Sequence, residues 1–174
     1  MTLIYGNDEQ ALAAAELLKE HLDITVLIKP PAALPPQRLT EFPVVKGVIR
    51  QAKGYLGAFE LTVDDYAASS PSSRSELNYG PARRDAKSRC DVLLDLSGGA
   101  PLFPAADLRD GYLRADPGDP AAVLRAVLKA RELTGSFDKP RYVTFTEDLC
   151  AHSRSKIVGC RRCLDLCPAG AITP

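Results

Sequence analysis

Apolar residues recur along the first part of the chain with the periods of strands and helices. Short apolar runs over residues 3–5 and 24–28 predict two buried strands. Between them, apolar positions return every three or four residues, which predicts an amphipathic helix. The chain is therefore expected to begin as β-α-β. The expected buried face of the helix comprises Ala11, Leu12, Ala15, Leu18 and Leu22.

A β-hairpin is predicted after a proline-rich connector over residues 30–43. Apolar and polar residues alternate over residues 44–50 and again over residues 55–63. Residues 67–89 are rich in Ser, Pro, Arg, Asn and Gly, so we expect a long polar loop there. The expected core positions of the hairpin are Val45, Ile49, Tyr55, Phe59, Leu61 and Val63.

Two further strands are predicted beyond this loop, over residues 90–96 and 142–145. The first strand starts at Cys90, which we interpret as a small buried hydrophobic residue. It ends in Ser97-Gly98-Gly99, where exposed amides are able to receive an anion. A turn is the preferred interpretation, because glycines commonly serve only to punctuate the chain.

The clearest helix of the sequence begins after Asp119, an N-cap residue that precedes proline at the first helical position. Gly135 is its expected end. The predicted packing face carries Val123, Leu124, Val127 and Leu128. Taken in order, the elements favour an α/β domain built on a mixed sheet with a few flanking helices.

Composition and charge exclude several classes of protein. The 174 residues include 22 basic and 22 acidic side chains, so the formal net charge of zero favours neither nucleic acid nor an anionic membrane as partner. No stretch approaches the roughly 18 apolar residues of a membrane span, and the amino terminus lacks the pattern of a signal peptide. We therefore expect a soluble, cytoplasmic protein.

Four of the five cysteines lie close together near the carboxyl end, in the pattern C-x9-C-x2-C-x3-C-P. A cubane iron–sulfur cluster needs thiolates that approach its corners from different directions, and such short gaps in a loop allow this. The pattern predicts a [4Fe–4S] site whose cofactor-binding and metal-ligating residues are Cys150, Cys160, Cys163 and Cys167. The expected domains are residues 1–140, an α/β domain with a docking role, and residues 141–174, the ferredoxin-like segment.

Other interpretations of the cysteines remain open. Four thiolates also bind zinc, although structural zinc sites usually show two C-x2-C knuckles and only one is present. A thioredoxin-like redox motif would lie near a first strand, whereas Cys160 and Cys163 lie at the far end. His152 is interpreted as a loop residue rather than a ligand. The segment also carries a local positive charge from Arg154, Lys156, Arg161 and Arg162, which either attracts an acidic redox partner or is simply solvated.

The segments over residues 91–105, 108–117, 149–154 and 159–168 resemble a family of large proteobacterial 4Fe–4S ferredoxin-type proteins. The resemblance covers most of the chain and implies an electron carrier rather than a catalyst. It further implies a redox partner protein connected with formate dehydrogenase or its maturation.

The resemblance also bears on which cysteines bind which cluster. Members of the family resemble two-cluster ferredoxins, in which a second motif follows and the fourth cysteine of each motif ligates the other cluster. This implies that Cys150, Cys160 and Cys163 hold the first cluster, while Cys167 either reaches a second cluster or closes the local one. The given chain ends at Pro174, before any second motif. We therefore expect an amino-terminal fragment of a two-cluster member that holds its cluster weakly, so that the isolated chain can lack it.

Two further functional classes are consistent with the sequence. One is a docking or maturation-factor domain with an incomplete metal site, and the other is a zinc-stabilised interaction module. Metal analysis distinguishes the zinc module from the electron carrier.

Overall fold

The chain forms two compact units, Met1–Gly135 and Ser136–Pro174. The computed structural model describes residues 1–7, 9–31, 33–36, 41–104, 109–135, 144–167 and 172. The domain boundary predicted after residue 140 falls between residues 136 and 143, outside the described residues. Each unit is described by itself.

The strands described in the amino-terminal unit form one seven-stranded mixed sheet in the order β5-β4-β3-β2-β1-β6-β7. Neighbours from β3 through β2, β1 and β6 to β7 run parallel, whereas β4 runs antiparallel to both β3 and β5. This confirms the predicted α/β class with a mixed sheet. The strands are β1 (Thr2–Gly6), β2 (Ile24–Ile28), β3 (Val44–Lys53), β4 (Phe59–Ala68), β5 (Ala86–Cys90), β6 (Val92–Leu96) and β7 (Tyr112–Arg114).

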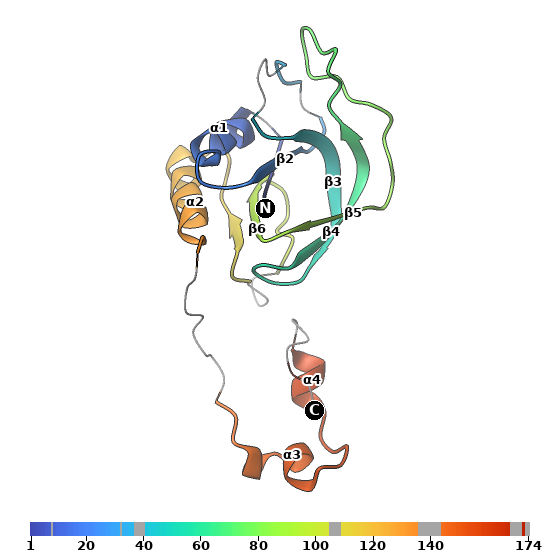
Figure 1. The fold of residues 1–174 in the computed structure, drawn as a ribbon, viewed down its shortest axis with the longest axis vertical. Coiled ribbons are helices and arrows are strands. Elements are labelled where there is room, and N and C mark those ends of the chain that lie inside the picture. Colours follow the sequence, from blue (N-terminus) through green and yellow to red (C-terminus); the bar gives the residue numbers. More distant parts are fainter. Residues whose placement is uncertain are drawn as a thin grey trace. The chain divides into compact units, whose positions relative to one another are not determined.

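Two helices, α1 (Glu9–Leu18) and α2 (Pro120–Glu132), lie together on one face of the sheet (Figure 1). Alternate residues of the parallel strands point to that face, because successive side chains of a strand point to opposite sides. They form one hydrophobic core with the inner faces of both helices. Representative members are Ile4, Leu18, Val26, Leu94 and Val127.

The opposite face of the sheet is covered by strands instead of helices. Two register irregularities between β3 and β4, at Lys46/Val48 and Ile49/Gln51, interrupt the pairing at the start of the hairpin, and such bulges bend a strand. Gly47 lies at the first of them, and a Cβ atom there would be 2.5 Å from the Val63 Cγ1 atom. The curved strands β3 to β5 (Figure 1) thereby contribute to a second core. It includes Leu3, Tyr5, Leu27, Val45, Ile49, Phe59, Leu61, Val63, Cys90 and Leu93.

The capping prediction for α2 is confirmed, but its predicted packing face is only half right. The Asp119 carboxylate accepts hydrogen bonds from the Ala121 and Ala122 N–H groups, each at 3.0 Å. Val123 and Val127 are buried, whereas Leu124 and Leu128 are 49% and 50% exposed. Two small residues, Ala126 and Ala130, take the buried positions instead, which permits close packing of the helix against the sheet and α1.

Three other expectations need correction. Tyr55 lies outside the core at 44% exposure, because β4 begins only at Phe59. The polar stretch expected as one loop over residues 67–89 contains the end of β4 and most of β5, which pairs with β4. Cys90 ends β5 rather than starting β6, although it is buried as predicted.

The strand predicted over residues 142–145 is not found where it can be checked. Thr144 and Phe145 belong to no strand, and residues 142 and 143 lie outside the described residues. The last strand among the described residues is β7, and its three residues are too few to show a period in the sequence. Across the described ranges, no helix combines the length and apolarity needed to cross a membrane.

Candidate metal centre

The carboxy-terminal unit contains three short helical segments: η2 (Glu147–Leu149), α3 (Ala151–Ser155) and α4 (Arg162–Leu166). None of its described residues is buried. Large apolar side chains stand exposed instead, among them Leu149 at 83%, Val158 at 79% and Leu166 at 79%. A segment this short without a core of its own needs a metal, a cofactor or a partner to become stable.

Cys150 lies between η2 and α3 and is the N-cap residue of α3. The backbone N–H of Ser153 lowers the pKa of this thiol, and the Ser153 hydroxyl and the His152 N–H act in the same direction. Because the thiolate is the form that ligates metals, this environment favours metal binding at Cys150.

The loop after α3 turns back onto the residues that follow Cys150. Lys156 adopts the left-handed conformation with φ 52°, and the Gly159 N–H then donates a hydrogen bond to the His152 Nδ1 atom at 3.4 Å. A Cβ atom on Gly159 would lie 3.3 Å from the Ala151 carbonyl oxygen, so glycine permits this close approach. The residue after Cys150 and the residue before Cys160 are therefore in contact across the nine-residue gap.

The remaining three cysteines lie in or beside α4. Cys160 and Cys163 are exposed and Cys167 is half-buried. Cys163 lies within α4, and Cys167 is the residue that follows its last helical residue, Leu166. No disulfide joins any of the five cysteines, all of which lie among the described residues.

The described conformation does not gather a complete ligand set. Among the described residues, no three His, Cys, Asp or Glu side chains lie close enough together to hold one metal ion. The donor set nevertheless fits an iron–sulfur cluster in its chemistry, since it offers four thiols that are exposed or half-buried and not consumed in disulfides. Binding would require the segment from Cys150 to Cys167 to close around the cluster.

Two further expectations concern His152 and the cationic side chains that lie near the four cysteines in the sequence. His152 lies in α3 and not in a loop as expected, and its Nδ1 atom accepts the hydrogen bond from Gly159, so the side chain helps to hold the loop that follows the helix. The cationic side chains are exposed and form no ion pair within the part of the chain that the structure describes. They are Arg154, Lys156, Arg161 and Arg162.

The Ser97-Gly98-Gly99 turn of the amino-terminal unit uses its amides internally. The Ser97 N–H donates to the Asp95 carboxylate at 3.0 Å, and the Gly99 N–H donates to the Ser97 hydroxyl at 3.3 Å. Gly98 has φ +64°, which suits glycine. These contacts support the turn interpretation over an anion site formed by the amides.

We expect Cys150 to be alkylated faster than an ordinary thiol at neutral pH. Its lowered pKa raises the thiolate fraction, so the midpoint of the rate against pH should fall below that of an ordinary thiol. As the pH falls below that midpoint, the thiolate is protonated and the rate declines. Mass spectrometry of peptides after brief iodoacetamide treatment between pH 6 and 10 (roughly the span that brackets a thiol pKa) measures this.

Two controls accompany this measurement. Ser153→Ala removes one of the groups that lower the Cys150 pKa, so it should slow the alkylation a few-fold. Burial raises the pKa of Cys90 to about 12, and this thiol should stay unmodified in the folded chain. Equal rates at Cys150 before and after Ser153→Ala would contradict the contribution of the Ser153 hydroxyl to the stabilisation of the thiolate, whereas the Ser153 N–H is present in both chains.

The chain has no significant match among protein-family models, curated proteins or solved structures. What the structure defines is an α/β domain on a mixed sheet, followed in sequence by a cysteine-bearing segment.

Proposed function

We propose that this chain is an iron–sulfur electron-transfer protein of the ferredoxin type. Its [4Fe–4S] cluster would be held by Cys150, Cys160, Cys163 and Cys167. The single observation that carries the proposal is the contact of Gly159 with Ala151 and His152, which brings the backbone beside two distant cysteines together. When bound, such a cluster accepts and releases one electron.

The residues around the cysteines support this role. The Ser153 and His152 N–H groups favour the thiolate of Cys150, the form that binds iron. The cations of the segment would partly offset the negative charge of a cluster with four thiolates and raise its reduction potential. Cys167 would either complete this cluster or ligate a second one, as the resemblance to two-cluster ferredoxins implies.

Surface chemistry supports a protein as the redox partner. Cationic side chains and exposed apolar side chains occur together over residues 144–167. An apolar contact area with charges around it is typical of protein–protein interfaces, and positive charge favours an acidic partner. We propose a cytoplasmic partner such as a formate dehydrogenase system, which rests on the family resemblance alone.

The loop contact provides a direct test of the proposal. Gly159→Val adds a branched side chain where even a Cβ atom is 3.3 Å from the Ala151 carbonyl oxygen, so the loop should no longer close. We expect this variant to take up iron several-fold less than the unmodified chain after anaerobic reconstitution with iron and sulfide. Iron and acid-labile sulfide per chain are the measured quantities.

A glycine of the other unit provides the matched control. A Cβ atom on Gly80 would come no closer than 3.8 Å to the Ala68 carbonyl oxygen, so Gly80→Val should leave iron uptake unchanged. Equal iron uptake by Gly159→Val and Gly80→Val would show that the loop contact does not contribute to binding, and the main support for the proposal would be lost.

The exposed apolar side chains of the carboxy-terminal unit also favour a second candidate, a docking or maturation-factor domain. That function predicts that the chain still binds its partner when the four cysteines are replaced by serine. Loss of both partner binding and electron transfer in this variant would instead support the electron carrier.

A further inference from the structure

Three large apolar side chains are exposed on the two helices of the amino-terminal unit. Leu17 of α1 is 58% exposed, and Leu124 and Leu128 of α2 are half exposed. Leu124 and Leu128 are four residues apart and therefore lie on the same side of α2. Exposed apolar side chains form a contact surface when they lie next to one another, so their positions around each helix decide what they can do.

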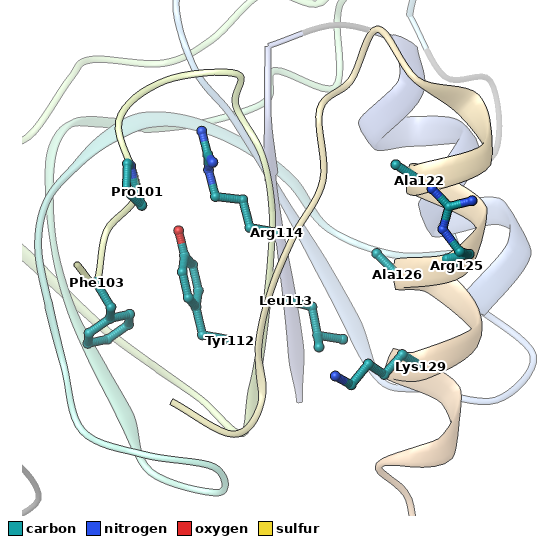
Figure 2. Close-up of a pocket in the computed structure, with 9 residues that line it drawn as sticks. All are labelled: Pro101, Phe103, Tyr112, Leu113, Arg114, Ala122, Arg125, Ala126 and Lys129. Carbon is teal, nitrogen blue, oxygen red and sulfur yellow. The ribbon is translucent and has the colours of Figure 1, made fainter. Parts of the chain in front are cut away.

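The leucines of α2 lie on the flank that faces α1. Helix α1 contacts β1 and β2, whereas α2 contacts β6 and β7, so β7 lies on the side of α2 away from α1. That side carries Ala122 and Lys129, which line a cavity next to β7 (Figure 2). Because each residue turns a helix by about 100°, Leu124 lies about 140° from Lys129 and about 160° from Ala122 around α2. Leu124 therefore lies on the side of α1.

Leu17 lies on the flank of α1 that faces α2. Lys19 continues the last turn of α1, since its N–H donates to the Ala15 carbonyl oxygen at 2.9 Å. Its ammonium group pairs at 3.0 Å with the carboxylate of Glu41, which comes shortly before β3 on the side away from α2. Leu17 and Lys19 are about 160° apart around the helix. Leu17, Leu124 and Leu128 therefore form one apolar stripe along the junction of the two helices, the leucine seam.

The helices carry opposite charges on the two sides of this seam. Residues 9–20 include three acidic side chains and one basic one, whereas α2 includes three basic side chains and one acidic one. Among the described residues, Glu9 and Glu20 have no ion-pair partner, and neither do Lys129 and Arg131. A two-fold axis along the seam would place α1 of one copy over α2 of a second copy, so that opposite charges meet twice.

We propose that the leucine seam is the interface of a homodimer of this chain. Leu124 and Leu128 of each copy contact Leu17 of the other. Outside them, the acidic side of α1 faces Arg125 and Lys129 of the other copy. The contact area of two short helices is small, so the dimer is reversible, with half of the chains associated at a concentration on the order of 100 µM. The interface belongs to the amino-terminal unit and does not depend on the proposed iron–sulfur function.

Sedimentation velocity of the full chain tests this proposal. The measurement spans about 10 to 500 µM, in low-salt buffer with a reductant that prevents disulfides between copies. We expect the weight-average mass to rise with concentration from that of one chain, 18.8 kDa, toward twice that value. A mass of one chain at every concentration would overturn the proposal, and would mean that the seam is covered by another part of this chain or by a different partner.

Leucine variants show which apolar side chains are responsible. Leu124→Gln combined with Leu128→Gln should raise the concentration of half association at least about tenfold, because both copies lose apolar contact. Leu149→Gln combined with Leu166→Gln makes the same change at more exposed leucines of the carboxy-terminal unit, and should alter it less than about twofold. Circular dichroism confirms that the variants are folded. Equal losses in the two double variants would mean general apolar association and would contradict the proposed interface.

Charge reversal tests the pairing of α1 with α2 of the other copy. Glu16→Lys with Glu20→Lys leaves both helices basic, and Arg125→Glu with Lys129→Glu leaves both acidic, so each variant alone should associate at least about tenfold more weakly. An equimolar mixture should recover the association to within about threefold of the unmodified chain, because each basic helix then meets an acidic one. A mixture that associates no better than the separate variants would show that the proposed arrangement is wrong.

Discussion

Replacement of both Cys160 and Cys163 by serine is expected to abolish the iron–sulfur chromophore of the anaerobically reconstituted chain. A cubane cluster contains four irons, and loss of two thiolates leaves too few ligands to retain it. Iron and acid-labile sulfide per chain should therefore fall from about four toward zero. Both cysteines are exposed, so serine at these positions removes no packing and should leave the fold unchanged.

Cys90→Ser provides the matched control, because Cys90 is buried in the sheet of the amino-terminal unit and is not expected to bind iron. This variant should bind as much iron as the unmodified chain. Equal iron in the unmodified chain and in the Cys160/Cys163 variant would contradict the proposed ligand set. A colourless chain with one tightly bound zinc and no labile sulfide would favour the zinc-stabilised module instead.

The chain as purified should hold its cluster weakly. No described residue of the carboxy-terminal unit is buried, so oxygen and chelators would reach a cluster there from several sides. We expect well under four irons per chain before reconstitution and rapid loss of colour with a chelator. A stable brown chain that keeps close to four irons under these conditions would contradict this expectation.

Asp95→Ala is expected to lower the free energy of unfolding of the amino-terminal unit by about 3 kcal/mol. The Asp95 side chain is completely buried and accepts hydrogen bonds from the Tyr112 hydroxyl and the Ser97 N–H. Its removal leaves both donors without this acceptor in the interior and removes the counter-charge near Arg114. Chemical denaturation of the full chain followed by circular dichroism measures the loss.

Two variants test whether this loss of stability comes from the hydrogen bonds of Asp95 or only from the removal of a negative charge. Burial, with the Asp95 hydrogen bond, raises the pKa of Tyr112 above its ordinary value, so the hydroxyl stays protonated and donates. Tyr112→Phe removes that hydroxyl and should cost about 1–2 kcal/mol. Asp23→Ala removes an exposed carboxylate and should change stability by less than about 0.5 kcal/mol. Equal losses for Asp95→Ala and Asp23→Ala would contradict the structural role of the network.

Elements with strong local signals were predictable from the sequence. The apolar run over residues 24–28 coincides with β2, and the hairpin pairs β3 with β4 as predicted. Asp119 caps α2 as its position before Pro120 indicated. The spacing of the cysteines is likewise a local feature, but whether they bind a cluster stays a prediction, because the described conformation does not gather them.

Sites assembled from distant segments were not predictable in this way. The buried network around Asp95 of β6 includes Tyr112 and Arg114 of β7, and β7 itself was missed because three residues carry no clear period.

The sequence alone determined the elements whose signals are contained within a few residues: the β-α-β start, the hairpin, the capped helix and the cysteine spacing. Tertiary structure decided which edges the short strands β5 and β7 occupy, and whether Leu124 or Ala126 faces the core. It also decided that Asp95 is buried beside Tyr112. These outcomes depend on hydrogen bonds and packing between residues far apart in the chain, and a local pattern of polarity carries no information about such partners.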